Sequence, residues 1–169
     1  MSGNRPLIYW DTSIFLAWAK EEKRKPGEMD GVKECVRGVD SGDIILVTSH
    51  LTKTEILESK MTTEAQEKLS RLLKRRNVRS VALDGRVGDL SSEIRDYYQR
   101  LKQTDGGPSL STPDAIHLAT AILYQADEFH TFDEKDSQNS RGLIPLSGNV
   151  AGYNLIICKP KAKQLGLIY

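Results

Sequence analysis

The chain has 169 residues, of which 38% are hydrophobic and 28% are charged, and its 24 basic and 23 acidic side chains leave a net charge of +1. This length and composition exclude a disordered chain and are sufficient for one domain that buries a full core. The near-neutral balance also excludes a protein that is basic over its whole surface, although it does not say where the charges lie.

The first two predicted elements are a buried strand and the helix that follows it. The apolar run at residues 7–10 stops at Asp11, as a buried parallel strand would. Thr12 or Ser13 is then expected to cap a helix that runs through Trp18. The sequence therefore places a charged side chain between a very apolar strand and a helix that is expected to be buried.

Helix and strand signals alternate through the middle of the chain. Apolar residues at helical spacing predict helices, and short apolar runs predict strands. Thr63 and Gln66 fit a capping box for one helix, which Asn77 is expected to close. In chain order the predicted elements are a helix over 32–39, a strand over 44–47, helices over 51–56 and 63–76, a strand over 78–83 and a helix over 90–101.

The C-terminal part continues the same alternation after a loop at 104–111. Thr112, Pro113 and Asp114 are expected to open a helix as its cap, first residue and second residue. This helix is apolar nearly all round and is expected to be buried. Short strands are predicted over 129–132, directly before Asp133, and over 155–158.

These signals describe one α/β domain with three layers, in which helices flank a central, mostly parallel sheet of about five strands. We assign residues 1–158 to this domain and residues 159–169 to a C-terminal tail. No stretch approaches the ~18 apolar residues that a membrane span needs. Cys35 and Cys158 are far apart, expected to be buried and inert, and match no metal or disulfide pattern. A reduced, cytoplasmic protein is therefore expected.

Four acidic residues are expected to converge on one edge of the sheet. Asp11 and Asp133 follow strands, Asp114 lies at a helix start, and Glu55 lies in the helix after the second strand. Each acid alone could be an ordinary cap or turn residue. Together they would repel unless a cation offset their charge, and carboxylate oxygens suit Mg²⁺ or Mn²⁺. Such ions promote phosphodiester cleavage.

Four segments around these acids resemble the sequence motifs of the PIN domain family, and among its members the chain most resembles the VapC-type ribonuclease toxins. The match at Thr112-Pro113-Asp114-Ala115-Ile116-His117 is the most specific of the four. Their order and spacing fit the family from Leu7 to about Cys158. The four segments are residues 8–16, 48–58, 112–121 and 126–133.

The resemblance implies a PIN-like fold and metal-dependent cleavage of RNA by the four acids, with Mg²⁺ or Mn²⁺ as cofactor. It also implies a homodimer and an antitoxin protein as partner. Ser13 and Thr131 occupy positions that support the acids in this family, where Ser13 orients an acid or a water molecule. Asp136 is expected to add a weaker outer contact or to cap a short helix after it.

Further side chains have more than one interpretation. A basic run could bind RNA phosphates beside the acids or could be a solvated helix face. It comprises Lys68, Arg71, Lys74, Arg75, Arg76 and Arg79. His117 could bind zinc together with Asp114, but a hydrogen bond inside the domain is favoured. Trp18, Tyr97 and Tyr98 are expected in the core or at a dimer face rather than under RNA bases. Exposed apolar surface on the helices over 32–39 and 90–101 would suit subunit or antitoxin contacts.

Competing functions depend on single positions. A haloacid-dehalogenase phosphatase would carry a second acid where Ser13 stands, and a receiver domain would carry paired acids at the end of the first strand. The remaining alternative is a PIN-like protein that binds or processes RNA without a toxin role. The leading hypothesis is a metal-dependent endoribonuclease that acts as the toxin of a toxin–antitoxin pair.

Overall fold

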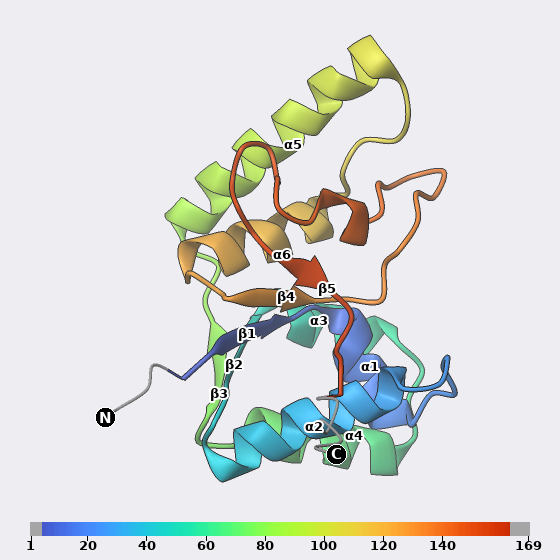
Figure 1. Ribbon diagram of the computed structural model, residues 1–169, viewed down its shortest axis with the longest axis vertical. Helices are drawn as coiled ribbons and strands as arrows, with labels where there is room; N and C mark the ends of the chain where they lie inside the picture. Colours follow the sequence, from blue (N-terminus) through green and yellow to red (C-terminus); the bar gives the residue numbers. More distant parts are fainter. Residues whose placement is uncertain (1–4, 163–169) are drawn as a thin grey trace, which may run out of the picture.

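The computed structural model describes residues 5–162 of the chain. The centre of the protein is a five-stranded parallel sheet (Figure 1). The strand order is β3-β2-β1-β4-β5, and every neighbouring pair is parallel. The predicted fold class is therefore confirmed. The strands are β1 (Leu7–Trp10), β2 (Ile45–Ser49), β3 (Val78–Val81), β4 (Glu128–His130) and β5 (Ile157–Cys158).

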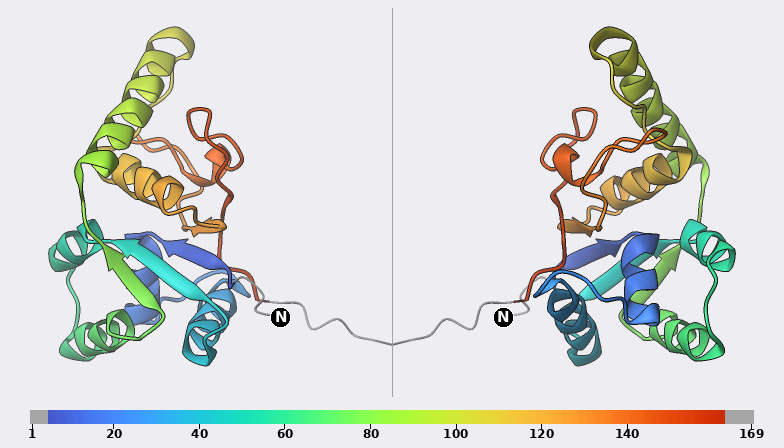
Figure 2. Two further views of the ribbon diagram at one scale, coloured as in Figure 1. Left: turned by 90° about the vertical axis from the view of Figure 1, so that its left-hand side faces the viewer. Right: turned by 90° about the vertical axis from the view of Figure 1, so that its right-hand side faces the viewer.

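Helices cover both faces of this sheet, so that the domain has three layers (Figure 2). One face carries α1 (Thr12–Lys20), α2 (Glu28–Ser41) and α4 (Thr63–Leu73), and the other carries α5 (Gly85–Asp105) and α6 (Thr112–Leu123). The short α3 (Leu51–Glu58) follows β2 and contacts both α1 and α6. A 3₁₀ helix, η1 (Ile144–Leu146), precedes β5. No helix in the described part of the chain is long and apolar enough to cross a membrane.

The alternation of side chains along the strands produces two separate cores. Tyr9 and Phe129, on neighbouring strands, stack with ring centroids 5.0 Å apart and belong to the core beneath α5 and α6. Trp10 points to the other face, where its ring meets Phe15 of α1 edge-on. A strand that is buried on both faces has a continuous run of apolar residues. This is why the apolar run at residues 7–10 correctly predicted β1.

The strand order reverses direction between β1 and β4. The chain first adds β2 and β3 on one side of β1 and then crosses the sheet to add β4 and β5 on the other side. In open α/β sheets, ligands bind outside the carboxyl ends of the strands at this switch point. Asp11 and Asp133, which follow β1 and β4, therefore lie where such a fold places its functional site.

The caps of three helices differ from the predicted ones by one position. Asp11, rather than Thr12 or Ser13, caps α1, because its carboxylate accepts the N–H of Ile14. Ser111 rather than Thr112 caps α6, so Pro113 and Asp114 are its second and third residues. Thr62 rather than Thr63 caps α4. In each case an oxygen-bearing side chain stands directly before the expected cap, and local sequence does not decide between such neighbours.

Asn77 does not close α4 as predicted, since that helix ends at Leu73. The amide group of Asn77 instead donates to the carbonyl of Val39, 2.9 Å away, and accepts from Arg5. Asn77 thus joins the start of β3 to α2 and to the segment before β1, contacts across many residues that no local motif indicates.

The apolar face of α2 is buried, which corrects the expectation that it would be exposed for subunit contacts. Val32, Val36 and Val39 are fully or almost fully buried against the sheet. On α5, Ile94 and Tyr98 are also buried, and Tyr97 keeps 39% of its surface exposed. Both helices use their apolar stripes to complete the domain's own cores.

The described part of the predicted tail, residues 159–162, packs against the domain. Gly31 lies so close to Pro160 that a Cβ at this position would be 2.3 Å from the Pro160 carbonyl oxygen. Lys159 forms ion pairs with Glu28, at 2.6 Å, and with Glu134. Residues 1–4 of the predicted domain and residues 163–169 of the predicted tail lie outside the described residues.

Candidate functional site

Asp11 is held at the end of β1 by donors from two other segments. The Ser13 hydroxyl donates to its Oδ1 at 2.6 Å, and the Thr131 hydroxyl donates to its Oδ2. Its side chain is 7% exposed. Burial raises the pKa of Asp11 above its ordinary value of 3.8, although the bonds from Ser13 and Thr131 act in the opposite direction. Asp11 is therefore an oriented carboxylate in a place that penalises its charge.

The same two hydroxyls connect β1 to the segment after β4. The Thr131 oxygen accepts the backbone N–H of Asp133 at 3.0 Å, and the Ser13 oxygen accepts the N–H of Phe132 at 3.2 Å. Each hydroxyl thus donates to Asp11 and accepts from the Asp133 segment. This cross-linking fixes the backbone position of Asp133 relative to the Asp11 carboxylate.

Asp133 experiences the charge of the neighbouring acids directly. Its pKa is raised from 3.8 to about 6, first by burial, then by the negative charges of Asp114 and Asp11. Like charges raise a carboxyl pKa in this way only when they lie close together. The structure therefore brings these three acids to one place at the switch point of the sheet.

Asp114 is held by two serines at the start of α6. Ser111 donates to Asp114 Oδ2 while its own oxygen accepts the Asp114 backbone N–H, and Ser140 donates to the same Oδ2 at 2.8 Å. Ser140 also accepts the backbone N–H of Ser111 at 3.1 Å. Sequence reasoning missed both serines, because it placed the cap at Thr112 instead of Ser111 and because Ser140 lies in a loop that carries no sequence signal.

Glu55 reaches the same region from α3. Its Oε2 accepts from the Thr12 hydroxyl and lies 2.7 Å from His117 Nε2. Burial acts to raise the pKa of Glu55, but the hydrogen bonds from His117 and Thr12 outweigh it and hold the pKa below its ordinary 4.5. Because Thr12 is adjacent to Asp11, and His117 is one helical turn after Asp114, Glu55 is joined to the elements that carry two other acids.

Hard carboxylate oxygens of this kind suit a divalent cation such as Mg²⁺ or Mn²⁺. The fit follows from the donor set together with the raised pKa of Asp133, since burial and the charges of Asp114 and Asp11 both oppose its ionised form and a bound cation would offset them. Asp11, Glu55, Asp114 and Asp133 are the residues that could hold the ion.

Asp136 has a structural contact in place of the predicted helix cap. Its Oδ1 accepts the backbone N–H of Gly142 at 2.9 Å, and residues 134–143 contain no helix for it to cap. Its charge adds only the smallest of the contributions that raise the pKa of Asp133. Asp136 therefore stabilises the loop that carries Ser140 by accepting this hydrogen bond.

The basic run does not gather beside the acids. Arg75 and Arg76 line a cavity of about 480 Å³ with Arg5, Gly42 and Asn77, which precede β1, β2 and β3. This is the amino edge of the sheet, a strand length of roughly 13 Å from the carboxyl edge. Of the other members, Lys68 pairs with Glu21, Arg71 pairs with Glu67, and Lys74 and Arg79 are exposed.

The loop between α1 and α2 supplies cations nearer to the acids than much of that run. The guanidinium of Arg24 lies 3.8 Å from the ring centroid of Phe132, and Lys25 Nζ lies 3.6 Å from Glu134, so the two residues flank Asp133. Its sequence carries no signal of this role, because basic and acidic residues are interleaved over positions 20–25. Only the fold shows that it reaches the segment after β4.

His117 is buried and hydrogen-bonded inside the domain, as favoured from the sequence, rather than paired with Asp114 for zinc. Its Nε2 faces Glu55 and its Nδ1 lies 2.7 Å from the Tyr9 hydroxyl. Among the aromatic residues, Tyr98 lies in the core as predicted, at 3% exposed, and Trp18 is partly buried beneath the Lys68 ammonium, whereas Tyr97 is exposed and not part of the core.

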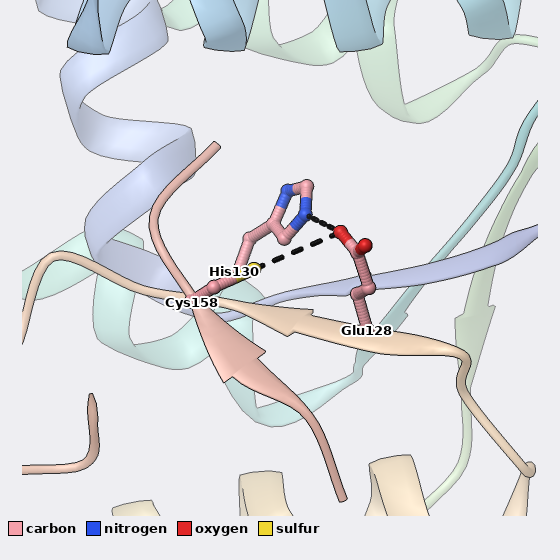
Figure 3. Close-up of side chains that lie close together, drawn as sticks. All are labelled: Glu128, His130 and Cys158. Atoms are coloured by element: carbon pink, nitrogen blue, oxygen red, sulfur yellow. Dashed lines mark hydrogen bonds and ion pairs between the residues drawn. The ribbon is translucent and has the colours of Figure 1, made fainter. Parts of the chain in front are cut away.

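A second group of metal-ligand side chains, separate in composition from the four acids, lies on β4 and β5 (Figure 3). Glu128, His130 and Cys158 point to the same side of the sheet, and their ligand atoms lie within 4.8 Å of one another. The Trp10 indole N–H donates to His130 Nδ1 at 3.2 Å, so the neutral ring carries its proton on the Nε2 that faces Glu128. The nitrogen that faces Glu128 and Cys158 is therefore a hydrogen-bond donor to Glu128 and has no lone pair free for a metal.

The thiols next to this group are poor nucleophiles. Burial and the charge of Glu128 raise the pKa of Cys158 to about 11. Burial likewise raises the pKa of Cys35 to about 12. We therefore interpret Glu128, His130 and Cys158 as a hydrogen-bonded group on one face of β4 and β5, in which both other side chains contact Glu128 Oε2. The expected burial is confirmed for Cys35 but not for Cys158, which is only partly buried, and the raised pKa of each thiol makes it a weak nucleophile.

Comparison with known proteins agrees with this geometry. The family model for the PIN domain matches residues 8–140. A chain of the VapBC2 complex from Rickettsia felis, bound to a DNA fragment from its promoter, superposes with a TM-score of 0.61 at 15% identity, over 89% of this chain and 98% of that chain. A chain of a toxin–antitoxin complex from Klebsiella pneumoniae superposes with a TM-score of 0.54 at 20% identity, over 88% and 99%. A search of curated proteins found no match. The chain is a member of the PIN domain family.

Proposed function

We propose that this protein is a metal-dependent endoribonuclease of the VapC type and the toxin of a toxin–antitoxin pair. The observation that carries the proposal is the gathering of Asp11, Asp114 and Asp133 at the switch point of the sheet, where burial first and then the charges of Asp114 and Asp11 raise the pKa of Asp133 to about 6. A cluster of acids that destabilises its own charge is the arrangement expected where a cation binds. Membership of the PIN domain family supports the same interpretation.

Asp11, Glu55, Asp114 and Asp133 would hold one or two Mg²⁺ or Mn²⁺ ions. When bound, such an ion acts as a Lewis acid that lowers the pKa of water and stabilises negative charge on phosphate oxygens. The protein supplies the orientation: the carboxylates of Asp11, Glu55 and Asp114 accept from hydroxyl groups, and the backbone N–H of Asp133 is hydrogen-bonded to Thr131, before any ligand arrives. Preorganised ligands do not have to be reoriented during the reaction, and this is the main contribution of the fold.

RNA is the proposed substrate, and its phosphates need cations beside the acidic site. Lys25 is the best placed of these, because its side chain is 72% exposed and it lies next to the segment that carries Asp133. Arg24 is more restricted, since it pairs with Glu22 at 2.7 Å and covers Phe132. Lys74, Arg76 and Arg79 are proposed to contact RNA further from the cleavage point.

A protein partner is proposed from an exposed apolar groove next to α3. Leu57 is 84% exposed, and it borders a cavity of about 430 Å³ between α3 and α4. Ile56, Met61, Leu69 and Leu73 line it. Apolar surface of this kind indicates a partner protein, and the structural neighbours from toxin–antitoxin complexes indicate an antitoxin. A homodimer is also part of the proposal, to be checked by light scattering after size-exclusion chromatography.

The test is cleavage of RNA by the purified protein with Mn²⁺ or Mg²⁺, and its loss with EDTA. Asp114→Asn keeps a side chain that can accept from Ser111 and Ser140 but removes the charge, and we expect it to lower the cleavage rate at least about 100-fold. Asp136→Asn is the matched control, since the Asp136 carboxylate accepts a backbone N–H from Gly142 and makes only the smallest contribution to the pKa of Asp133. Equal cleavage by Asp114→Asn and the parent would show that the site is wrongly assigned.

Growth separates the toxin role from a role in RNA processing. Expression of the parent should arrest growth, whereas expression of Asp114→Asn should not. Arrest should be relieved by the product of a small open reading frame encoded beside the gene. Cleavage without growth arrest would support the alternative of an RNA-processing protein without a toxin role.

A further inference from the structure

We propose that His117 is a positioning residue that holds the Glu55 carboxylate in the orientation needed to bind metal. The proposal rests on the proposed function, since it concerns the same metal site. His117 is 2% exposed and lies on α6, one turn after Asp114. Its imidazole therefore stands behind the site, between a buried tyrosine and one of the acids.

The hydrogen bonds around Tyr9 determine where the proton of the imidazole lies. The backbone N–H of Ser49 donates to the Tyr9 hydroxyl oxygen at 3.1 Å, and that hydroxyl lies 2.7 Å from His117 Nδ1. With its oxygen accepting from Ser49, the hydroxyl is free to donate its own proton to Nδ1. The neutral ring then carries its proton on Nε2, which lies 2.7 Å from Glu55 Oε2. The chain of hydrogen bonds runs from Ser49 through Tyr9 and His117 to Glu55.

These hydrogen bonds give the two carboxylate oxygens of Glu55 different roles. Oε2 accepts from both His117 Nε2 and the Thr12 hydroxyl. Within residues 5–162, Oε1 accepts no hydrogen bond, so it is the oxygen available to a metal ion. A carboxylate held by two donors on one oxygen presents the other in a single direction, which is how partners of metal ligands raise metal affinity.

Glu55 needs this support because its own helix is weakly anchored. α3 is eight residues long and buries only Thr52 and Ile56. The contact between Glu55 and His117 ties α3 to α6, which also carries Asp114. Without it, the carboxylate would keep the Thr12 bond alone and could rotate away from the other acids.

Two substitutions separate the halves of the imidazole. In His117→Gln, the amide nitrogen stands near the position of Nε2 and can still donate to Glu55. In His117→Asn, the shorter amide stands near Nδ1, so its oxygen can still accept from Tyr9 while the donor to Glu55 is lost. Both are buried polar amides, and each removes one bond of the chain. A purely structural role would make the two variants equally defective.

We expect Mn²⁺ titrations followed by electron paramagnetic resonance to show a roughly 10–100-fold weaker affinity for His117→Asn and an affinity within a few-fold of the parent for His117→Gln. RNA cleavage by His117→Asn should recover at high Mn²⁺ with an unchanged KM for RNA. Equal Mn²⁺ affinity in both variants, whether parental or weak, would overturn the proposal. A parent that binds Mn²⁺ but cuts no RNA would refute the proposed nuclease and leave the His117 test intact.

The tautomer can be measured on the parent protein, without dependence on the folding of any variant. Long-range ¹H–¹⁵N spectra distinguish the ring nitrogen that carries the proton, and the chain has only three histidines. We expect the His117 signal of a neutral ring protonated on Nε2. A ring protonated on Nδ1 alone could not donate to Glu55, and that result would also overturn the proposal.

Discussion

Replacement of Asp133 by asparagine should stabilise the metal-free protein at neutral pH. The pKa of Asp133 is raised from 3.8 to about 6 by burial, by Asp114 and by Asp11. Between these two pH values the folded state binds more protons than the unfolded state, so this carboxyl makes the folded protein less stable as pH rises. The amide of the Asp133→Asn variant is neutral at every pH and removes that cost.

The size of the effect follows from the shift. Raising a carboxyl pKa from 3.8 to about 6 corresponds to about 3 kcal/mol at most. Asp133 is partly exposed, and solvent screening reduces this to about 1 kcal/mol. For a chain of this length, a gain of about 1 kcal/mol raises the melting temperature by about 2–4 °C.

The assay is thermal and urea unfolding of EDTA-treated protein at pH 7.5 and pH 4.0. The gain should be present at pH 7.5 and should nearly disappear at pH 4.0, where the parent carboxyl is protonated in the folded state. Asp136→Asn is the control and should change little. Added Mn²⁺ should reverse the order, because it stabilises only the parent strongly. A metal-free Asp133→Asn variant that is less stable than the parent at pH 7.5 would refute the reasoning.

Three further predictions concern the same edge of the sheet. The Mn²⁺ affinity of the parent, measured by calorimetry, should fall as pH drops below about 6, because Asp133 must lose its proton to bind; a flat profile from pH 5 to 7.5 would contradict this. Thr131→Val should lower the free energy of unfolding by about 1–3 kcal/mol, because it removes a donor to the buried Asp11 and an acceptor of the Asp133 N–H; urea unfolding that matches the parent would show that these bonds contribute little. Lys25→Ala should weaken RNA binding and reduce its salt slope by about 1, whereas Arg76→Ala at the amino edge should change binding less; fluorescence anisotropy with a labelled RNA at several salt concentrations measures both, and the opposite order would redirect the RNA path to the other edge of the sheet.

The strands and helices could be predicted because their signals are local. β1 is a run of four apolar residues followed by an acid, and the run is continuous because the strand is buried on both faces. The same reasoning located Asp133 after β4 and Asp114 in the first turn of α6. These residues are functional candidates because parallel strands bring their carboxyl ends to one edge of the sheet.

The errors have a common cause. Three features were interpreted from their sequence neighbours, although their contacts come from residues far away in the chain. They are Asn77, the apolar face of α2, and the arginines at 75 and 76. Arg75, for example, pairs at 2.7 Å with Asp40 of α2, and β2, α3 and α4 lie between these two residues in the sequence. The basic run at positions 68–79 contains no acidic residue. In the folded protein, acids from other helices and loops nevertheless form ion pairs with two of its members.

The sequence by itself determined the α/β alternation, the four acids and their positions at strand and helix ends, because each depends on residues within a few positions of one another. The family resemblance already placed Ser13 and Thr131 beside the acids, but only the tertiary structure decided which carboxylate each supporting side chain contacts. Thr131 reaches Asp11 across 120 positions, Ser140 reaches Asp114 across 26, and His117 reaches Glu55 across 62. Hydrogen bonds over such separations depend on how the strands are ordered and how the loops return, and local spacing contains no record of either.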